Sequence, residues 1–279
     1  MMDTALAPPV TRPLRRRLAL RLPEGWQALL GALIVLGLIP ILFRMDPARF
    51  KPFFYDIQAS GTLAERPFTG EWWWAWRFLA NGLGTTVLVA LLSILLSLPL
   101  ATVFALLRLS APLPLRIPAV LLIEGIRALP VLLFIWFTFR FLARQGVELA
   151  VMWPVVIALT LYTTVVNAET LRAGILALPT GQMEAARSLG MSYFQAMGYV
   201  ILPQTFRHML PPLIAQFVTL LKDTSLGYIV GLRELTRHAE ILYQGQRNPM
   251  ETIYVVALIY FILNYLLGQL ALWVHRRLD

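Results

Sequence analysis

The feature that most constrains this chain is a series of six long apolar stretches. They cover about residues 26–43, 78–107, 117–142, 147–168, 211–230 and 254–275. A helix needs about 20 apolar residues to cross the hydrocarbon core of a bilayer. Helices also satisfy all of their own backbone polar groups there. The sequence therefore predicts an all-α integral membrane protein with about six transmembrane helices.

Composition agrees with this fold class and excludes several functions. Hydrophobic residues make up 58% of the 279 residues and charged residues 14%, whereas soluble domains contain about 25% charged residues. The absence of cysteine excludes a disulfide framework and a cysteine nucleophile. The three histidines lack metal-ligand spacing, and no GxxxxGK[ST] phosphate loop is present. We therefore expect no metal site and no ATP site of the chain's own, which also argues against an integral membrane enzyme.

The net charge of +9 is interpreted as a topology signal rather than as a nucleic-acid surface. Five arginines precede the first apolar stretch and two follow the last, and cytoplasmic segments collect such residues. This pattern predicts that both termini are cytoplasmic. The bias is weak, because the predicted outer segments also carry basic residues: Arg44, Arg49, Lys51, Arg66, Arg233, Arg237 and Arg247.

The region before the second apolar stretch is divided into three parts. Residues 1–25 form a basic cytoplasmic tail, residues 26–43 an extra N-terminal transmembrane helix, and residues 44–77 a periplasmic segment. A signal peptide would show similar features, but residues 43–46 contain no small-residue cleavage site, which favours an uncleaved anchor. The four tryptophans within residues 72–76 are typical of a membrane–water boundary, and less so of an aromatic cage for a ligand.

The loop at residues 169–210 is too polar to cross a membrane. A short helix is predicted over residues 182–189, stopped by Gly190. The 192–195 sequence is a capping box that starts a second helix, and Pro203 is expected to end it. This predicts a cytoplasmic helix–turn–helix, which could be either a rigid docking knob or a hairpin lying on its own bundle.

The residues of the first loop helix suit contact with another surface. Ala185 and Ala186 make one side low and flat, Glu184 and Arg187 are spaced as a rim pair, and three residues supply apolar contact: Met183, Leu189 and Phe194.

The loop also carries a family resemblance. Glu184-Ala185-Ala186, then Gly190, then Val200-Ile201-Leu202-Pro203 resemble the EAA loop of the membrane permease subunits of bacterial ABC importers, although the family usually has Ile at the position of Val200. Further motifs resemble the polar amino-acid branch (His, Glu, Gln, Arg and Asp permeases): Asn81–Thr86, Arg127–Pro130, Asn167–Glu169, Arg172–Ile175, Gly181-Gln182, Ser188–Gly190, Leu202–Gln204 and Lys222–Leu226. The resemblance covers residues 78–275, a five-helix type I importer permease core.

This resemblance implies a function and a set of partners. The chain would be a permease subunit in the bacterial inner membrane that moves polar L-amino acids, of the glutamate, aspartate or glutamine type, by alternating access. It would be no enzyme itself and would bind no cofactor. Two ABC ATPases would hold ATP-Mg, and the other partners would be a second permease, identical or homologous, a periplasmic amino-acid-binding protein and membrane lipid. The alternative is an ion-driven secondary transporter.

The resemblance also assigns candidate residues. The coupling contact to the ATPase would be made by Met183, Glu184, Ala185, Ala186, Leu189 and Gly190.

A second set of candidates consists of polar residues within the apolar stretches, where charges are costly. Lys222 and Asp223 lie about ten residues into the fifth stretch and, as neighbours on a helix, cannot pair face to face. A helix broken there could meet the ammonium and carboxylate groups of an amino acid. The candidates are Lys222, Asp223, Thr224, Ser225, Asn81, Thr85 and Glu169, with a structural network between subunits as the alternative. Glu124 and Arg127 are interpreted as a structural ion pair.

Overall fold

The structure is a computed structural model that describes residues 24–55 and 73–278. The predicted basic tail, apart from its last two residues, and residues 56–72 of the predicted periplasmic segment lie outside this range. Contacts divide the chain into two units, residues 1–45 and 46–279. The first unit contains α1 (Glu24–Leu42), an apolar helix with Pro40 in its last turn.

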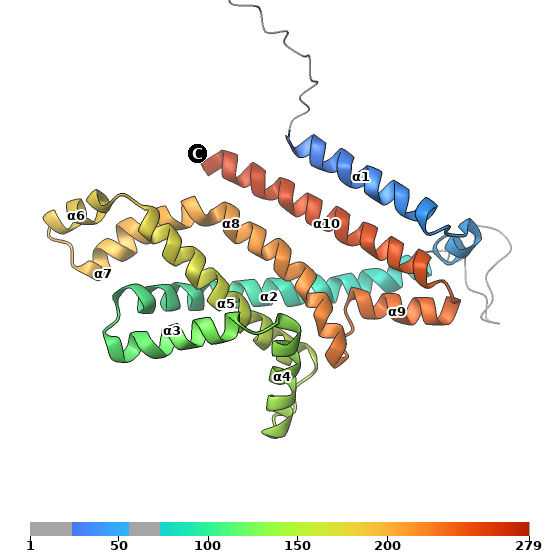
Figure 1. The fold of residues 1–279 in the computed structure, drawn as a ribbon, viewed down its shortest axis with the longest axis horizontal. Helices are drawn as coiled ribbons and strands as arrows, with labels where there is room; N and C mark the ends of the chain where they lie inside the picture. The colour runs from blue at the N-terminus through green and yellow to red at the C-terminus, as the bar shows by residue number, and fades with distance from the viewer. Residues whose placement is uncertain (1–23, 56–72, 279) are drawn as a thin grey trace, which may run out of the picture. The chain divides into compact units, whose positions relative to one another are not determined.

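The described residues of the second unit form helices joined by turns and short loops, with no strand among them (Figure 1). Its elements are η1 (Pro47–Phe53), α2 (Trp74–Ser110), α3 (Leu113–Arg127), α4 (Val131–Arg144), α5 (Met152–Ala177), α6 (Thr180–Ser188), α7 (Tyr193–Ala196), η2 (Met197–Ile201), α8 (Leu202–Asp223), η3 (Thr224–Val230), α9 (Leu235–Gln246) and α10 (Pro249–Leu278).

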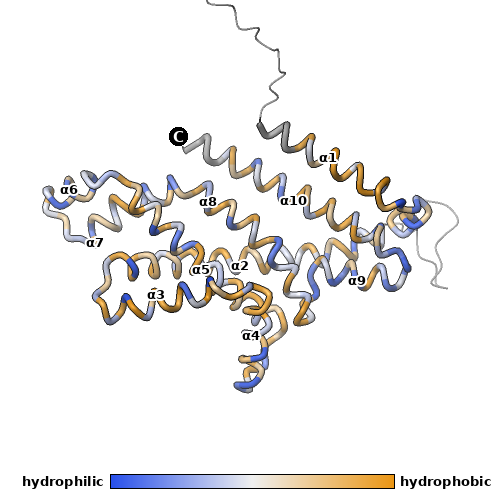
Figure 2. The backbone as a smooth tube through the Cα atoms, viewed as in Figure 1, coloured by the Kyte–Doolittle hydropathy of each residue, from blue (hydrophilic) through white to orange (hydrophobic). Residues whose placement is uncertain are grey.

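The described residues include four helices long and apolar enough to cross a membrane. They are Trp74–Ser110, Met152–Ala177, Tyr193–Val230 and Pro249–Trp273, and the number rises to six if two broken helix pairs each count as one span. Figure 2 shows hydrophobic residues along these long helices and more hydrophilic ones at α6 and α9. The predicted all-α membrane fold is confirmed.

The third apolar stretch is not one straight helix, as the sequence suggested. It is broken into α3 and α4, whose axes differ by 111°. Pro130 is the N-cap residue of α4, and a proline lacks the N–H that would continue the preceding helix. The fourth helix, in contrast, is longer than expected and runs to Ala177, so Glu169 lies inside a helix and not at its end.

The expected effect of the prolines in the fifth segment is also corrected. Pro203 does not end a helix, because α7, η2, α8 and η3 continue as one segment. It is the second residue of α8, directly after the π-helical turn Met197–Ile201, and the first turn of a helix tolerates a missing N–H. Pro211 and Pro212, expected at the start of the span, lie inside α8.

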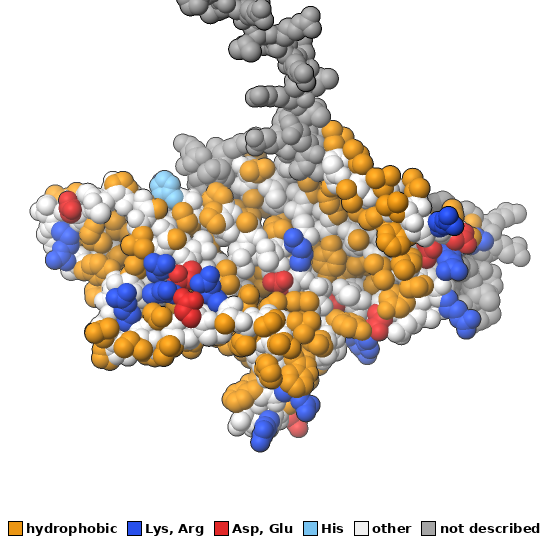
Figure 3. Space-filling view, in the orientation of Figure 1, with side chains coloured by type: hydrophobic (Ala, Val, Ile, Leu, Met, Phe, Trp, Pro, Cys, Tyr) orange, Lys and Arg blue, Asp and Glu red, His pale blue; other side chains and the backbone are white. Residues whose placement is uncertain are grey.

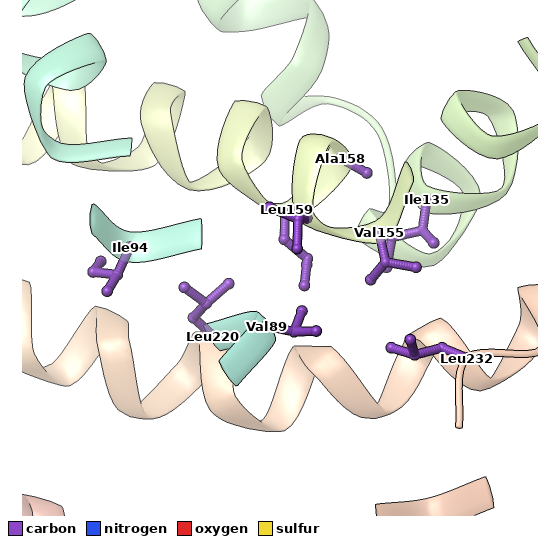
Figure 4. Close-up of a cluster of buried hydrophobic side chains, with 9 residues drawn as sticks. Val89, Ile94, Ile135, Val155, Ala158, Leu159, Leu220 and Leu232 are labelled. Carbon is purple, nitrogen blue, oxygen red and sulfur yellow. The ribbon is translucent and has the colours of Figure 1, made fainter. Parts of the chain in front are cut away.

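The centre of the second unit is α5. Its hydrophobic stretch is 67% buried, compared with 11% for α10. Figure 4 shows Val89 of α2, Ile135 of α4, Leu159 of α5 and Leu220 of α8 meeting in one buried cluster. In a bilayer such packing stabilises by van der Waals contact, since lipid tails are as apolar as leucine. This packing positions the loop helices α6 and α7 and the break between α3 and α4.

Gly82 marks a close approach between α2 and α9. A Cβ atom at this position would lie 2.7 Å from His238 Nδ1 and 3.0 Å from the Glu234 carbonyl oxygen. We expect Gly82→Ala to lower the free energy of unfolding by about 1–3 kcal/mol through overpacking, measured by thermal unfolding of the full chain in detergent. Gly84→Ala is the control on the same helix, because a Cβ there meets nothing within 4 Å. Equal losses from the two substitutions would contradict this prediction.

Candidate functional site

The turn between α6 and α7 is held by local hydrogen bonds. Gly190 has a φ of +83°, a left-handed conformation that suits glycine. In the next residues, the backbone N–H of Gln195 donates to Ser192 Oγ (3.3 Å), and the N–H of Ser192 donates to Gln195 Oε1 (2.8 Å). The predicted capping box is confirmed. Together these features make the turn between the two helices rigid.

The helix pair has a packed side and an exposed side. Ala186, Met197 and Ile201 are buried beneath it, whereas the side chains of Leu189 and Phe194 are 81% and 77% exposed. The pair lies at one end of the second unit (Figure 1). The pair thus packs against its own bundle on one side, where the Tyr193 and Ser110 hydroxyls are hydrogen-bonded, and leaves large apolar side chains open at the tip.

The candidate coupling residues divide between these sides. Met183 and Glu184 line a groove of about 280 Å³ beside the end of α5. Ala185 is exposed and Ala186 is buried, so the two alanines do not form one open flat face. Glu184 and Arg187 are both exposed, and no ion pair within 4.0 Å joins them in the described structure. The expected rim pair is therefore wrong.

A cluster of five charged residues connects three helices near this end. Arg108 Nη1 at the end of α2 lies 2.8 Å from Glu124 Oε1 of α3 and 2.8 Å from Glu169 Oε1 of α5. Arg172 lies 3.0 Å from Glu169, and Arg127 lies 3.8 Å from Glu124. In Figure 3 charged side chains of both signs gather near α3 and α5. The predicted Glu124–Arg127 pair is confirmed, but it is one part of a larger cluster.

Sequence reasoning missed Arg108 as the residue that joins the cluster. An arginine at the end of an apolar stretch is typical of a cytoplasmic segment, and this pattern gives no sign of its partners. Glu169, a candidate for the substrate path, is held between two arginines, Arg108 and Arg172. Its carboxylate is therefore already paired.

The helix changes from α to 3-10 type at the second set of candidate residues, but the segment Tyr193–Val230 is not broken there. α8 ends at Asp223 and a 3-10 helix begins at Thr224. Thr224 Oγ1 donates to the carbonyl of Leu221 (2.8 Å) and Ser225 Oγ to that of Lys222 (2.7 Å). The Lys222 side chain is exposed, and no carboxylate lies within 4.0 Å of it among the described residues.

The remaining candidates lie on α2, which contacts η3. Asn81 is exposed and Thr85 is half-buried one turn later. Thr85 Oγ1 lies 3.4 Å from the Asn81 carbonyl oxygen. No hydrogen bond or ion pair joins Asn81 or Thr85 to Lys222–Ser225 within the described part of the chain.

A buried carboxylate that sequence reasoning did not single out joins the start of α9 to α10. Glu234 is fully buried and accepts hydrogen bonds from two backbone N–H groups in the first turn of α9, at 2.8 and 2.9 Å, and from Tyr260 Oη at 3.2 Å. Beside it, the N–H of Leu235 donates to Thr86 Oγ1 at 3.2 Å. Burial raises the pKa of the Glu234 carboxyl, although the two N–H donors act against this shift. Glutamate is not a usual N-cap residue, so the sequence signal was weak.

Long apolar helices packed around α5, with a rigid helix pair at one end, have the architecture of a membrane transport subunit. The chain belongs to the family of binding-protein-dependent transport system inner membrane components, which matches residues 72–279. It is therefore the permease subunit of an ATP-binding-cassette importer. This assignment excludes the alternative of an ion-driven secondary transporter.

Individual relatives cover the same region. The chain is 38% identical over 206 residues to the probable glutamine ABC transporter permease protein GlnP of Bacillus subtilis (strain 168), covering 72% of this chain and 92% of the relative. It is 39% identical over 216 residues to the glutamate transport system permease protein GluD of Corynebacterium glutamicum, covering 76% and 78%. A crystal structure of an amino acid ABC transporter with histidines matches with a TM-score of 0.67 and 32% identity, over 72% of this chain and 94% of that one.

Proposed function

We propose that this permease moves polar amino acids of the glutamine, glutamate or aspartate type across the bacterial inner membrane. The observation that carries this proposal is that relatives 38% and 39% identical are named for glutamine and glutamate transport. The charged and hydroxyl-bearing residues at the α8–η3 junction supply groups that suit a zwitterion.

The proposed assembly is a complete importer, in which this chain is one of several subunits. Two separate ATPase subunits hold ATP and Mg²⁺, so hydrolysis takes place outside this chain. A second permease, identical or homologous, completes the path, and a binding protein delivers the cargo from the periplasm. In this arrangement the α6–α7 pair and both termini face the cytoplasm, with residues 26–43 as an added helix before the 78–275 permease core.

Uptake by the reconstituted complex tests this function. The chain is placed in proteoliposomes with its ATPase and binding protein, and uptake of a panel of radiolabelled amino acids is measured. We expect uptake of glutamine, glutamate or aspartate that requires both ATP and the binding protein and is insensitive to ionophores. Uptake limited to sugars or to apolar amino acids would overturn the proposed substrate class.

The coupling role is assigned to Met183, Glu184, Ala185, Ala186, Leu189 and Gly190. The exposed Leu189 side chain is the apolar group that would enter the ATPase surface, and Glu184 is exposed one turn earlier on the same helix pair. The buried Ala186 would support this contact from below.

The substrate path is assigned to Lys222, Asp223, Thr224 and Ser225, with Asn81 and Thr85 nearby on α2. An exposed ammonium within a candidate span is costly against lipid, and this favours a hydrated path at Lys222. Glu169 is a weaker candidate for the substrate path, since its carboxylate is already paired with Arg108 and Arg172.

Substitution of the two charged residues tests the path. Lys222→Met and Asp223→Asn are each expected to reduce uptake roughly tenfold, because a hydrogen bond to a charged group contributes about 1.5–3 kcal/mol. The affinity of the free binding protein for its amino acid should not change. Asn264→Leu on α10, outside the assigned path, is the comparison variant. Wild-type uptake by both charge variants would rule out the path.

A further inference from the structure

The 3-10 helix η3 is joined to α9 by a tight turn. The N–H of Leu232 donates to the Gly227 carbonyl at 3.1 Å, and Gly231 between them has a φ of +84°. A Cβ atom at Gly227 would lie 2.8 Å from Leu232 Cδ2, and Leu232 is buried. The turn therefore packs closely on η3, and we expect the two to move together.

Side chains also connect η3 to α9. Tyr228 Oη of η3 donates to Glu240 Oε1 at 3.4 Å, and the Arg237 guanidinium lies 5.8 Å from the centroid of the Tyr228 ring. Arg237 and Glu240 form an ion pair with each other on α9. We call residues 224–246 the η3–α9 unit. It includes Thr224 and Ser225 of the assigned substrate path.

Two hydrogen bonds connect the start of α9 to neighbouring helices. Glu234 Oε2 accepts from Tyr260 Oη of α10 at 3.2 Å, and the N–H of Leu235 donates to Thr86 Oγ1 of α2, also at 3.2 Å. No lysine, arginine or histidine side chain lies within 4.0 Å of the Glu234 carboxylate in the described part of the chain. Glu234 is fully buried, and a buried polar group that loses a partner carries a large penalty. The bond to Tyr260 therefore constrains where α9 can lie.

The length of the Glu234 side chain suits a role beyond capping α9. Its two carboxylate oxygens accept from the N–H groups of Thr236 and Arg237 at 2.8 and 2.9 Å. Aspartate is a preferred N-cap residue and makes such bonds with a shorter side chain. Glutamate reaches Tyr260 as well. The same carboxylate thus caps α9 and holds it to α10.

We infer that Glu234 is a positioning residue for transport: its bond to Tyr260 holds the η3–α9 unit against α10 and so fixes the start of η3. The fully buried Glu234 acts on Thr224 and Ser225 through the turn at Gly231 and the bond between Tyr228 and Glu240. This inference rests on the substrate path proposed above, which needs η3 to stay in one place beside the end of α8.

Two substitutions remove the bond and leave the helix cap in place. Tyr260→Phe deletes only the donor hydroxyl, and Glu234→Asp keeps an N-cap residue that is too short to reach Tyr260. In proteoliposomes with the ATPase and the binding protein, each should lower the maximal uptake rate about tenfold. The double variant should be no slower than either single variant, because all three lack the same bond. Tyr265→Phe, on the same helix and outside this network, should retain wild-type uptake.

A single cysteine reports whether η3 moves. The chain has no cysteine of its own, so Leu226→Cys places its one thiol in η3, at a side chain that packs against the central buried cluster. Its modification by a maleimide, measured by mass spectrometry of the intact chain, should be about tenfold faster in the Tyr260→Phe and Glu234→Asp backgrounds. Leu171→Cys, in a separate buried cluster of α5, is the matched reporter and should be modified at an unchanged rate.

Several results would overturn this inference. One is an unchanged modification rate at Leu226→Cys in both backgrounds, because η3 would then not depend on the bond. A second is faster modification at Leu171→Cys as well, because the bond would then serve general stability. Wild-type uptake by both single variants, or a double variant about 100-fold slower than the wild type, would overturn it equally.

The modification rate also separates this inference from the proposed function. The labelling reaction needs no substrate, so its outcome does not depend on which molecule is transported. The proposed function fails instead if the wild-type complex takes up none of the polar amino acids in the panel.

Discussion

Uptake into proteoliposomes is expected to fall roughly tenfold when Gly190 is replaced by valine. The residue has a φ of +83° and open space around its Cβ position, so the substitution meets no clash but imposes a backbone cost of about 1–2 kcal/mol. A β-branched residue relieves this cost by leaving the left-handed conformation, which turns α6 away from α7. A change of 1.4 kcal/mol in the population of the coupling-competent turn corresponds to tenfold.

The control for this variant lies in the same helical loop. A Cβ at Gly198 also meets nothing within 4 Å, and its φ is not positive, so Gly198→Val should retain uptake. Glu184→Lys is the companion variant at the exposed surface of α6, and we expect ATP hydrolysis to continue there without uptake. Wild-type uptake by the Gly190→Val and Glu184→Lys variants would show that the helix pair does not couple transport to the ATPase.

Removal of Arg108 is expected to cost the largest amount of stability. Arg108→Met leaves Glu124 and Glu169 without their closest partner, and breaking a buried ion pair costs about 3–5 kcal/mol. We expect about 3 kcal/mol, the low end of this range, because the Arg108 and Glu169 side chains remain 21% and 16% exposed. The measurement is the free energy of unfolding of the full chain in detergent.

Arg127→Met is the matched comparison within the same cluster. Arg127 lies 3.8 Å from Glu124, and both side chains are at least 43% exposed, so its loss should cost less than about 1 kcal/mol. Glu169→Gln added to Arg108→Met should cost less than the sum of the two single substitutions, because the Arg108–Glu169 contact is already lost in Arg108→Met. Equal costs for the two single arginine variants would contradict a central role for Arg108.

The position of the charged cluster also predicts an effect on transport. Glu169 and Arg172 lie on α5 shortly before it ends at Ala177, and α6 begins at Thr180. Arg108 and Glu124 connect that end of α5 to α2 and α3. The loop helices therefore follow directly after the end of α5 that the charged cluster joins to α2 and α3. We expect Arg108→Met to lower uptake as well as the free energy of unfolding.

Two features were predictable because they depend on neighbouring residues alone. The capping box at Ser192 and Gln195 and the glycine turn at Gly190 agree with the sequence-based expectations. The roles of the prolines were not predictable in the same way. Pro130 breaks a segment whereas Pro203 is accommodated after a π-helical turn, and this difference depends on how the preceding turn is packed.

The sequence by itself determined the class of this protein, because the length of an apolar stretch decides whether a helix can cross a bilayer. It also determined the turn between the two loop helices through short-range hydrogen bonds and backbone preferences. Only the tertiary structure decided that Arg108 joins Glu124 and Glu169 and that Glu234 accepts a hydrogen bond from Tyr260 of α10. It also decided that Trp76 and Trp74 donate to the carbonyls of Phe53 and Tyr55. These partners are far apart in the sequence, and they meet because the packing of helices around α5 brings their side chains within reach.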